Sequence, residues 1–214
     1  MATIMSLLDL LMPPACAACG RVGALLCSRC LNGLQVPSRP ADRFLASDGG
    51  IVVGEALTMA MAAFAYEGPM RRALAALKYG GASRLAPILA WAATPALGNL
   101  LAITGRAVLV PVPLHRERQR ARGYNQSELI ARRLGTPMAL ALERVRPTTK
   151  QHRLNRAARL ANLRGAFRAS GVVPLTAILV DDIITTTATL EACASVLRHA
   201  GCSAVYGFAL AREV

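Results

Sequence analysis

The stretch from residue 177 to residue 191 constrains the fold of this chain more than any other. It reads Ala-Ile-Leu-Val-Asp-Asp-Ile-Ile-Thr-Thr-Thr-Ala-Thr-Leu-Glu, so a short apolar run leads directly into the adjacent acids Asp181 and Asp182. The apolar run predicts a buried strand that ends at the two acids. After a hydroxyl-rich turn, four apolar residues at helical spacing predict one buried helix face: Leu190, Cys193, Val196 and Leu197. The stretch therefore predicts a strand, a turn and a helix N-terminus in succession.

This succession predicts a binding site for a sugar phosphate. Ligands of open parallel sheets bind beyond the carboxyl ends of the strands, and the free N–H groups of a helix N-terminus attract an anion. We expect a phosphate at the turn, which consists of Thr185, Thr186, Thr187, Ala188 and Thr189. Because Asp181 and Asp182 would repel that phosphate, we expect them to accept hydrogen bonds from the hydroxyls of an attached sugar. The alternative is a buried strand whose two acids only cap a turn.

The charge of the chain points to polyanionic partners. The 214 residues carry a formal net charge of +13, and Lys78 and Lys150 are the only lysines among the 25 basic residues. Arginine makes planar, bidentate contacts with phosphates and carboxylates, which favours nucleotides, pyrophosphate or nucleic acid as ligands. A coding bias toward arginine and alanine is the alternative. The length allows one medium-sized domain with a small appendage.

Residues 85–104 form a stretch of twenty residues without a charge, which is long enough to span a bilayer. Pro87, Pro95 and Gly98 interrupt this stretch, and they favour a buried helix of about ten residues followed by a turn. The apolar run over residues 4–12 has no basic leader before it. We therefore expect a cytoplasmic protein that is not transmembrane.

Four cysteines near the N-terminus have the spacing of a zinc site. Cys16 and Cys19 form one Cys-x-x-Cys pair, and Cys27 and Cys30 form a second pair seven residues later. Two such pairs suit tetrahedral Zn²⁺, and four thiolate ligands leave no open position, so the role would be structural. Disulfides are the alternative, which a cytoplasmic setting disfavours.

A second cluster of charge follows a second expected strand, over residues 106–113. Arg116, Arg118, Arg120 and Arg122 come between this strand and a helix that Asn125 and Glu128 would start as a capping box. If this strand is parallel to the first, these arginines lie at the same edge of the sheet as the threonine turn. They are then candidates to bind pyrophosphate, with Arg116, Arg118 and Arg122 the foremost. A solvated surface loop is the alternative.

Several of these motifs resemble known families. The acids and threonines at 181–189 resemble the phosphoribosyl pyrophosphate (PRPP) signature of type I phosphoribosyltransferases, except that Thr187 stands where that signature has glycine. The Val-Pro-Val-Pro run and the segment Arg-Gly-Tyr-Asn-Gln at 122–126 are similar to the hallmark of the ComF family. A third similar pattern comprises Thr148, Gln151, Leu154, Arg159, Asn162, Ala166 and Phe167. ComF proteins are phosphoribosyltransferase-like proteins with a four-cysteine zinc module that are associated with competence and DNA uptake.

The resemblance implies a phosphoribosyltransferase-like α/β fold with a mainly parallel sheet, which the alternation of strands and helices also favours. We expect residues 1–35 to form an N-terminal helix and zinc module, residues 36–50 with their prolines and glycines to form a linker, and residues 51–214 to form the phosphoribosyltransferase-like domain. Asp181 and Asp182 would hold the ribose of PRPP, residues 185–189 its 5-phosphate, and Mg²⁺ would bridge ribose and pyrophosphate oxygens. Relatives also carry a Lys-Tyr like Lys78-Tyr79, which suggests a role near the ligand. The acceptor, the enzymatic activity and the oligomeric state stay open.

Residues 144–168 contain seven arginines and one lysine but no acid. Such a segment repels itself unless an anion neutralises it. One expected partner is PRPP, over which Lys150, Gln151 and Arg159 would close as a flexible loop, as the resemblance implies. The other is single-stranded DNA, which would follow the stripe of Arg153, Arg156 and Arg159. In that alternative function, the protein is a DNA-binding accessory protein whose PRPP site is regulatory or vestigial. A plain solvated helix remains a further alternative.

Overall fold

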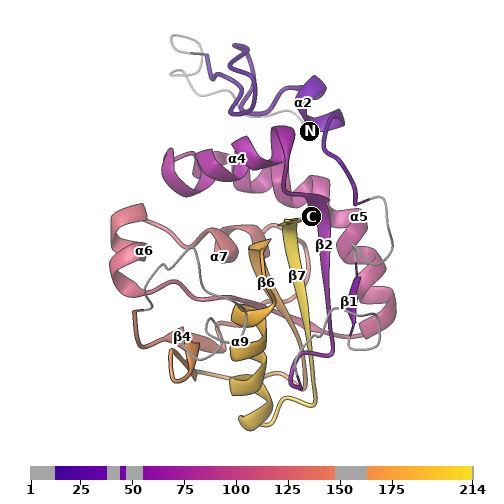
Figure 1. The fold of residues 1–214 in the computed structure, drawn as a ribbon, viewed down its shortest axis with the longest axis vertical. Coiled ribbons are helices and arrows are strands. Elements are labelled where there is room, and N and C mark those ends of the chain that lie inside the picture. Colours follow the sequence, from indigo (N-terminus) through magenta and orange to yellow (C-terminus); the bar gives the residue numbers. More distant parts are fainter. Residues whose placement is uncertain (1–12, 38–43, 47–54, 148–162, 214) are drawn as a thin grey trace.

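The computed structural model describes residues 13–37, 44–46, 55–147 and 163–213, and Figure 1 shows their arrangement. At its centre is a five-stranded sheet with the order β1-β2-β7-β6-β3. The strands are β1 (Phe44–Ala46), β2 (Met59–Ala65), β7 (Ala204–Arg212), β6 (Thr176–Ile184) and β3 (Val108–Pro111). Strand β1 is antiparallel to β2, and the other neighbouring strands are parallel. The prediction of an α/β fold with a mainly parallel sheet is confirmed.

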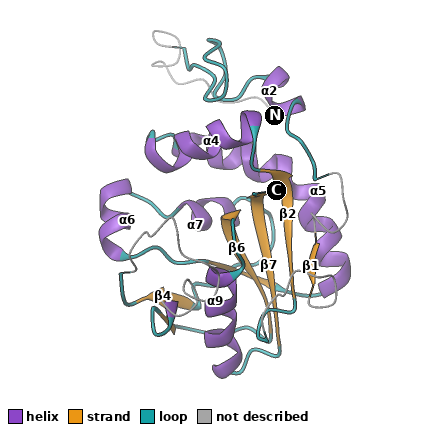
Figure 2. Cartoon of the chain, viewed as in Figure 1, coloured by secondary structure: helices purple, strands orange, loops and turns teal. Residues whose placement is uncertain are grey.

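Helices cover both faces of this sheet (Figure 2). On one face, Ile178 and Val180 of β6 pack into a core shared with α4 (Gly68–Tyr79), α5 (Ala86–Thr104) and α7 (Gln126–Ala131). On the other face, Ala177 and Leu179 pack toward α9 (Ala188–His199). Successive residues of a strand point to opposite faces. A strand covered on both faces is therefore apolar at every position, which explains the uninterrupted run before the acids.

One glycine allows the central layers to come this close together. A Cβ at Gly207 of β7 would lie 2.8 Å from Cδ1 of Leu190 in α9 and 3.0 Å from Cβ of Ala60 in β2. We expect Gly207→Ala to push α9 off the sheet and to destabilise the protein by about 1–3 kcal/mol, as overpacking of a core does. Urea denaturation measures this effect. A loss below about 0.5 kcal/mol would mean that the core adapts to the added methyl group.

The smaller elements lie around this centre. They are α2 (Ser28–Asn32), the 3-10 helix η1 (Ser83–Leu85), α6 (Arg116–Arg122) and a two-stranded antiparallel sheet of β4 (Leu142–Arg144) and β5 (Phe167–Ala169). Strand β1 falls within the segment predicted as a linker, residues 36–50, and it pairs with β2. The arginines between the expected strand and the expected helix lie in α6, so they are part of a helix and not of a surface loop.

The expectation of a short helix and a turn within residues 85–104 is wrong. Helix α5 continues for 19 residues through Pro95. Pro87 lies in the first turn, where a proline needs no N–H partner, and Pro95 is exposed, so only its own helical hydrogen bond is lost. The window from Ser83 to Thr104 is apolar and long enough to cross a membrane. This is weak evidence for a span, because Leu89, Leu97 and Leu100 of the same helix are buried in the core of the domain.

Candidate functional site

From the sequence we expected the strand to end at the two acids. The acids instead lie inside strand β6. Asp181 is paired with Ala209 of β7, and the strand continues to Ile184. On its other side β6 loses its neighbour earlier, because Pro111, the last residue of β3, is paired with Val180. The carboxylates therefore stand just beyond the carboxyl end of β3, at the edge of the sheet where a ligand of a parallel sheet binds.

Asp182 is buried and paired with a lysine. Its side chain is 6% exposed, and its Oδ2 lies 2.6 Å from Nζ of Lys78 at the end of α4. Burial lowers the pKa of Lys78, but the charge and hydrogen bond of Asp182, with the charge of Asp181, raise it by more, so the net shift is upward. Lys78 is therefore charged at neutral pH and offsets one of the two negative charges. The structure thus places Lys78 beside the two acids, and the role near a ligand suggested for Lys78-Tyr79 stays a prediction.

Asp181 is half-buried and has different partners. Its Oδ1 accepts hydrogen bonds from Oγ of Ser127, at 3.1 Å, and from the backbone N–H of Asp182, at 2.8 Å. Burial and then the negative charge of Asp182 raise the pKa of Asp181 to about 7, although the charge of Lys78 opposes this shift. At neutral pH the Asp181 carboxyl therefore exchanges a proton readily, and it either donates or accepts a hydrogen bond.

The threonine turn connects β6 to α9 without backbone strain. Thr187 precedes the first helical residue, Ala188, and has a φ of −71° and a ψ of −1°. Glycine at this position would be needed only for a positive φ, and among the described residues positive φ values occur at glycines alone. Thr185 is exposed, Thr186 and Thr189 are half-buried, and Thr187 and Ala188 are buried. The first N–H groups of α9 lie at the same sheet edge as the carboxylates.

Helix α6 supplies the arginines. In this helix no side chain is buried, and Arg116 and Arg120 are exposed. Arg122 donates a hydrogen bond to Gln126, which is in α7, and its guanidinium lies 5.6 Å from the centre of the Tyr79 ring. The helix that Asn125 was predicted to start begins at Gln126, with Asn125 Oδ1 accepting from Ser127 N. Glu128 is bonded to Arg132, however, so the second half of the expected capping box is replaced by an ion pair.

Ser127 and Arg144 were not predicted as site residues from the sequence. Ser127 contacts Asp181, and the charge of Asp181 shifts the pKa of Arg144. Arg144 is half-buried in β4, and its guanidinium lies 5.2 Å from the centre of the Phe167 ring. Burial and the charge of Arg118 lower the pKa of Arg144, whereas the charges of Cys193 and Asp181 raise it. The asparagine and serine of a helix start were a signal for Ser127, but nothing distinguished Arg144 from the other arginines.

The remaining predicted site residues are Lys150, Gln151, Arg153, Arg156 and Arg159, and all five lie outside the described residues. Their assignments to a flexible loop or to a nucleic-acid stripe therefore stay predictions.

The four N-terminal cysteines form a compact cluster that is suited to a metal ion. Their sulfur atoms all lie within 4.8 Å of one another, and Sγ of Cys19 lies 3.7 Å from Sγ of Cys27. Tetrahedral Zn²⁺ with Zn–S bonds of about 2.3 Å places its sulfurs roughly 3.8 Å apart, so the spacing fits. Gly20 and Gly23, with φ values of 77° and 112°, form the turn between the two pairs.

The protonation of these thiols also favours a cation. Burial raises the pKa of Cys16, but backbone N–H groups of Cys27, Ala18 and Cys19 outweigh it and lower the pKa to about 6. Burial and then the neighbouring thiols raise the pKa of Cys30 to about 12. Four thiolates at this spacing repel one another, and a divalent cation would remove that repulsion. The cluster could hold a metal such as zinc.

We expect the purified protein to contain one zinc ion per chain. Cys30→Ser should lower the zinc content severalfold, because a serine hydroxyl does not replace a buried thiolate ligand. Elemental analysis of the full chain measures this content. Cys202→Ser is the matched control, because Cys202 is a buried thiol outside the cluster. Equal zinc contents in the two variants would exclude a four-cysteine site.

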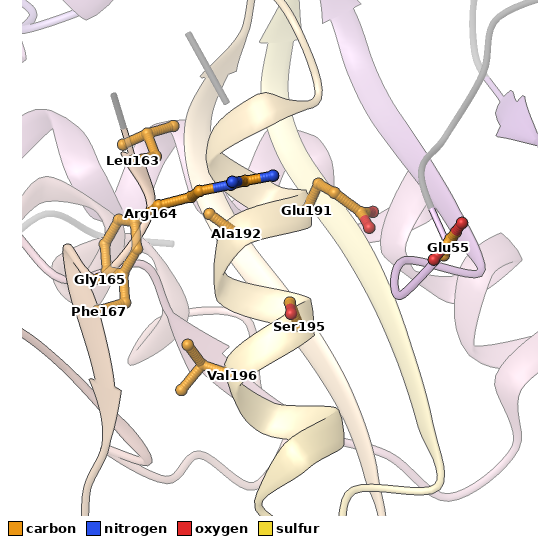
Figure 3. Close-up of a pocket in the computed structure, with 9 residues that line it drawn as sticks. All are labelled: Glu55, Leu163, Arg164, Gly165, Phe167, Glu191, Ala192, Ser195 and Val196. Carbon is orange, nitrogen blue, oxygen red and sulfur yellow. The ribbon is translucent and has the colours of Figure 1, made fainter. Parts of the chain in front are cut away.

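A hollow of about 380 Å³ lies along α9, and neither Asp181 nor Asp182 lines it (Figure 3). Arg164 extends across α9 toward Glu191, and Glu55 stands on the far side. Glu191 itself accepts hydrogen bonds from the backbone N–H groups of Ala56, at 2.9 Å, and Leu57, at 3.0 Å. Its carboxylate therefore anchors the chain that enters β2, and this role is structural.

Comparison with known proteins finds relatives that match about half of the chain. The chain is 36% identical over 112 residues to the DNA utilization protein YhgH of Salmonella typhi, which covers 50% of this chain and 49% of that protein. It is 34% identical over 113 residues to competence protein F of Haemophilus influenzae, covering 49% of each. It is also 34% identical over 107 residues to competence protein ComFC of Bacillus subtilis, covering 50% of this chain and 45% of that protein. The chain thus spans about half the length of the curated relatives it matches. No protein-family model matches it.

Proposed function

We propose that this chain, for which these relatives support the ComF family, binds PRPP at the carboxyl end of β6 as part of DNA utilisation or competence. Asp181 would accept hydrogen bonds from the ribose hydroxyls, and the first N–H groups of α9, with the hydroxyls of residues 185–189, would bind the 5-phosphate. The arginines of α6, above all Arg118, would approach the pyrophosphate. Mg²⁺ bound to the pyrophosphate would supply further charge neutralisation through oxygen ligands.

The observation that carries this proposal is the meeting of three elements at one sheet edge. Strand β6 brings a half-buried carboxylate, α9 brings a helix N-terminus, and Arg118 of α6 and Asp181 both shift the pKa of Arg144. A carboxylate alone would repel a phosphate ester, and a helix N-terminus alone would not select a sugar. Their combination matches a ligand with hydroxyl donors at one end and phosphates at the other.

A chain that binds PRPP in this way could also transfer its phosphoribosyl group. Departure of pyrophosphate needs charge placed around the leaving group rather than a strong protein base, and α6 would provide it. Asp181, with a pKa of about 7, is the side chain in the described site that exchanges a proton near neutral pH. A screen for pyrophosphate release against nucleobases and amines would identify an acceptor.

Calorimetry with PRPP and Mg²⁺ tests the proposed binding. Wild-type protein should bind the ligand, and Asp181→Asn should weaken binding at least about tenfold, because the amide loses the charged acceptor. Glu67→Gln is the control, since Glu67 is an exposed acid before α4 and its loss changes the net charge equally. The proposal fails if wild-type protein gives no binding heat, or if Asp181→Asn binds as tightly as the control.

A second candidate function is the binding of single-stranded DNA along α6. This seven-residue helix buries no side chain and presents four arginines, and the adjacent residue Tyr79 is 71% exposed. Exposed arginines and an aromatic ring suit a phosphate backbone and a stacked base. The names of the relatives favour this function as well, since they refer to DNA utilization.

The two candidate functions are separable by experiment. If DNA binds along α6, an oligonucleotide should bind with strong salt dependence, and Tyr79→Ala should weaken it by roughly 1–3 kcal/mol. The double variant Asp181→Asn/Asp182→Asn should abolish PRPP binding and leave DNA binding intact. Loss of both ligands in that variant would instead indicate one shared site.

A further inference from the structure

Helix α4 contacts both the cysteine cluster and the carboxylate pair. Near its start, Nε of Arg72 donates a hydrogen bond to the carbonyl of Ala18, which lies between Cys16 and Cys19. Six residues later, Nζ of Lys78 lies 2.6 Å from Oδ2 of Asp182. An α-helix rises 1.5 Å per residue, so roughly 9 Å of one helix separates the two contacts. Figure 1 shows α4 between the segment with the cysteines and the carboxyl end of β6.

The hydrophobic core also joins the cysteine segment to this helix. Four residues of the cysteine segment, residues 13–37, and four of α4 belong to one buried cluster: Cys16, Ala18, Leu26, Cys30, Met70, Ala73, Leu74 and Leu77. Two of the expected metal ligands therefore pack in the same core as α4. A change in the shape of the cysteine segment would displace α4, because close-packed cores transmit displacement.

The cysteine segment has little regular structure to hold this shape by itself. It contains the five-residue helix α2 and a single bridge between Ala15 and Val22. A helix of five residues is marginal on its own, and small sites of this kind gain their folding free energy from the metal. A bound metal would therefore fix the Ala18 carbonyl against Arg72.

The C-terminal end of α4 also contacts the end of α6 and the residues that follow it. The hydroxyl of Tyr124 donates to the carbonyl of Leu77 at 2.5 Å, and Arg122 lies against the ring of Tyr79. Displacement of α4 would consequently move Lys78 away from Asp182 and disturb the C-terminal end of α6 at the same time.

We infer that a metal ion at the four cysteines holds α4 in place, and that Arg72 and Lys78 are positioning residues through which the metal sets the charge state of the carboxylate pair. The cysteine cluster then supports the ligand site as well as its own segment. Only the effect on PRPP affinity rests on the proposed function; the coupling itself is a property of the protein without ligand.

The test compares Arg72→Met with Arg71→Met in the full chain, in buffer that contains zinc. Arg71 is the neighbouring residue and is exposed on the same helix, so the control removes the same charge from α4. Arg72→Met should raise the exchange rate of the amides of residues 70–79 at least about fivefold. Arg72→Lys should restore part of the protection, because it keeps a donor near Ala18.

A second readout reports on Lys78 rather than on general stability. Asp181 is faced by Lys78 from α4, Asp182 in β6, Arg144 from β4 and Cys193 from α9. The charge of Lys78 lowers the pKa of Asp181, so displacement of Lys78 would raise that pKa. Carbon NMR of the Asp181 carboxyl measures the pKa. We expect an upward shift in Arg72→Met and in chelated wild type, but not in Arg71→Met.

The inference is overturned if chelation leaves the amide exchange of α4 unchanged, or if Arg72→Met and Arg71→Met give the same Asp181 titration. Calorimetry adds the functional consequence, an affinity for PRPP with Mg²⁺ that falls about fivefold or more in Arg72→Met. Absence of PRPP binding to wild type would refute the proposed function, while exchange and titration would still decide whether the coupling exists.

Discussion

Replacing Lys78 with methionine is expected to lower the free energy of unfolding by about 3–5 kcal/mol. The side chains of Lys78 and Asp182 are 20% and 6% exposed, so the carboxylate would be left buried without its cation. Methionine keeps an apolar stem of similar length, so most of the loss would arise from the unpaired charge rather than from a cavity. Urea denaturation at neutral pH measures the change.

The double variant Lys78→Met/Asp182→Asn separates this cause from a general loss of packing. Asparagine removes the unpaired charge and nearly preserves the shape of the side chain. The double variant should therefore be more stable than Lys78→Met alone, by roughly 1–3 kcal/mol. If the two substitutions instead add their losses, Lys78 and Asp182 do not act as a pair.

The parts of the site that the sequence predicted are those that depend on residues close together in the chain. The apolar run, the threonines and the helix of residues 188–199 follow one another without a gap, so local pattern sufficed to place β6, the turn and α9. The four cysteines were likewise found by spacing, and their sulfurs do meet. The parallel sheet followed from the alternation of strands and helices.

The orientation of the acids could not be predicted in the same way. They lie within β6 because its neighbour β7 continues alongside, whereas β3 stops at Pro111. Strand length is thus set by a partner that is distant in the sequence. Asp182 is buried because Lys78 comes from α4, and a local pattern carries no information about that contact. From the sequence we expected both acids to face a ligand, but Lys78 neutralises Asp182 within the protein.

Helix α5 shows a second limit of sequence patterns. Pro95 was interpreted as the end of a helix, but the helix continues because its flanking residues are held in the core. Ala93, Ala96 and Leu97 are buried on either side of this proline. Tertiary packing compensates for the one hydrogen bond that a proline removes, and the propensity of a single residue does not measure that compensation.

The pH dependence of stability should reveal Asp181 directly. Its pKa of about 7, raised from 3.8 by burial and by the charge of Asp182, means that the folded state binds this proton more tightly than the unfolded state does. The resulting stability is fully present below about pH 4 and is lost as the pH rises through about 7. A shift of this size corresponds to about 4 kcal/mol between those limits, as an order of magnitude.

Asp181→Asn isolates this contribution, because asparagine does not titrate. The difference in unfolding free energy between the variant and wild type should change with pH in favour of the variant, by up to about 4 kcal/mol between pH 4 and pH 8. A constant difference across this range would show that Asp181 titrates normally. The expected result has a functional reason as well. Burial opposes the ionisation of Asp181, and hydrogen-bond donors of a ligand would stabilise its ionised form, so the site would gain binding free energy from a charge that weakens the empty fold.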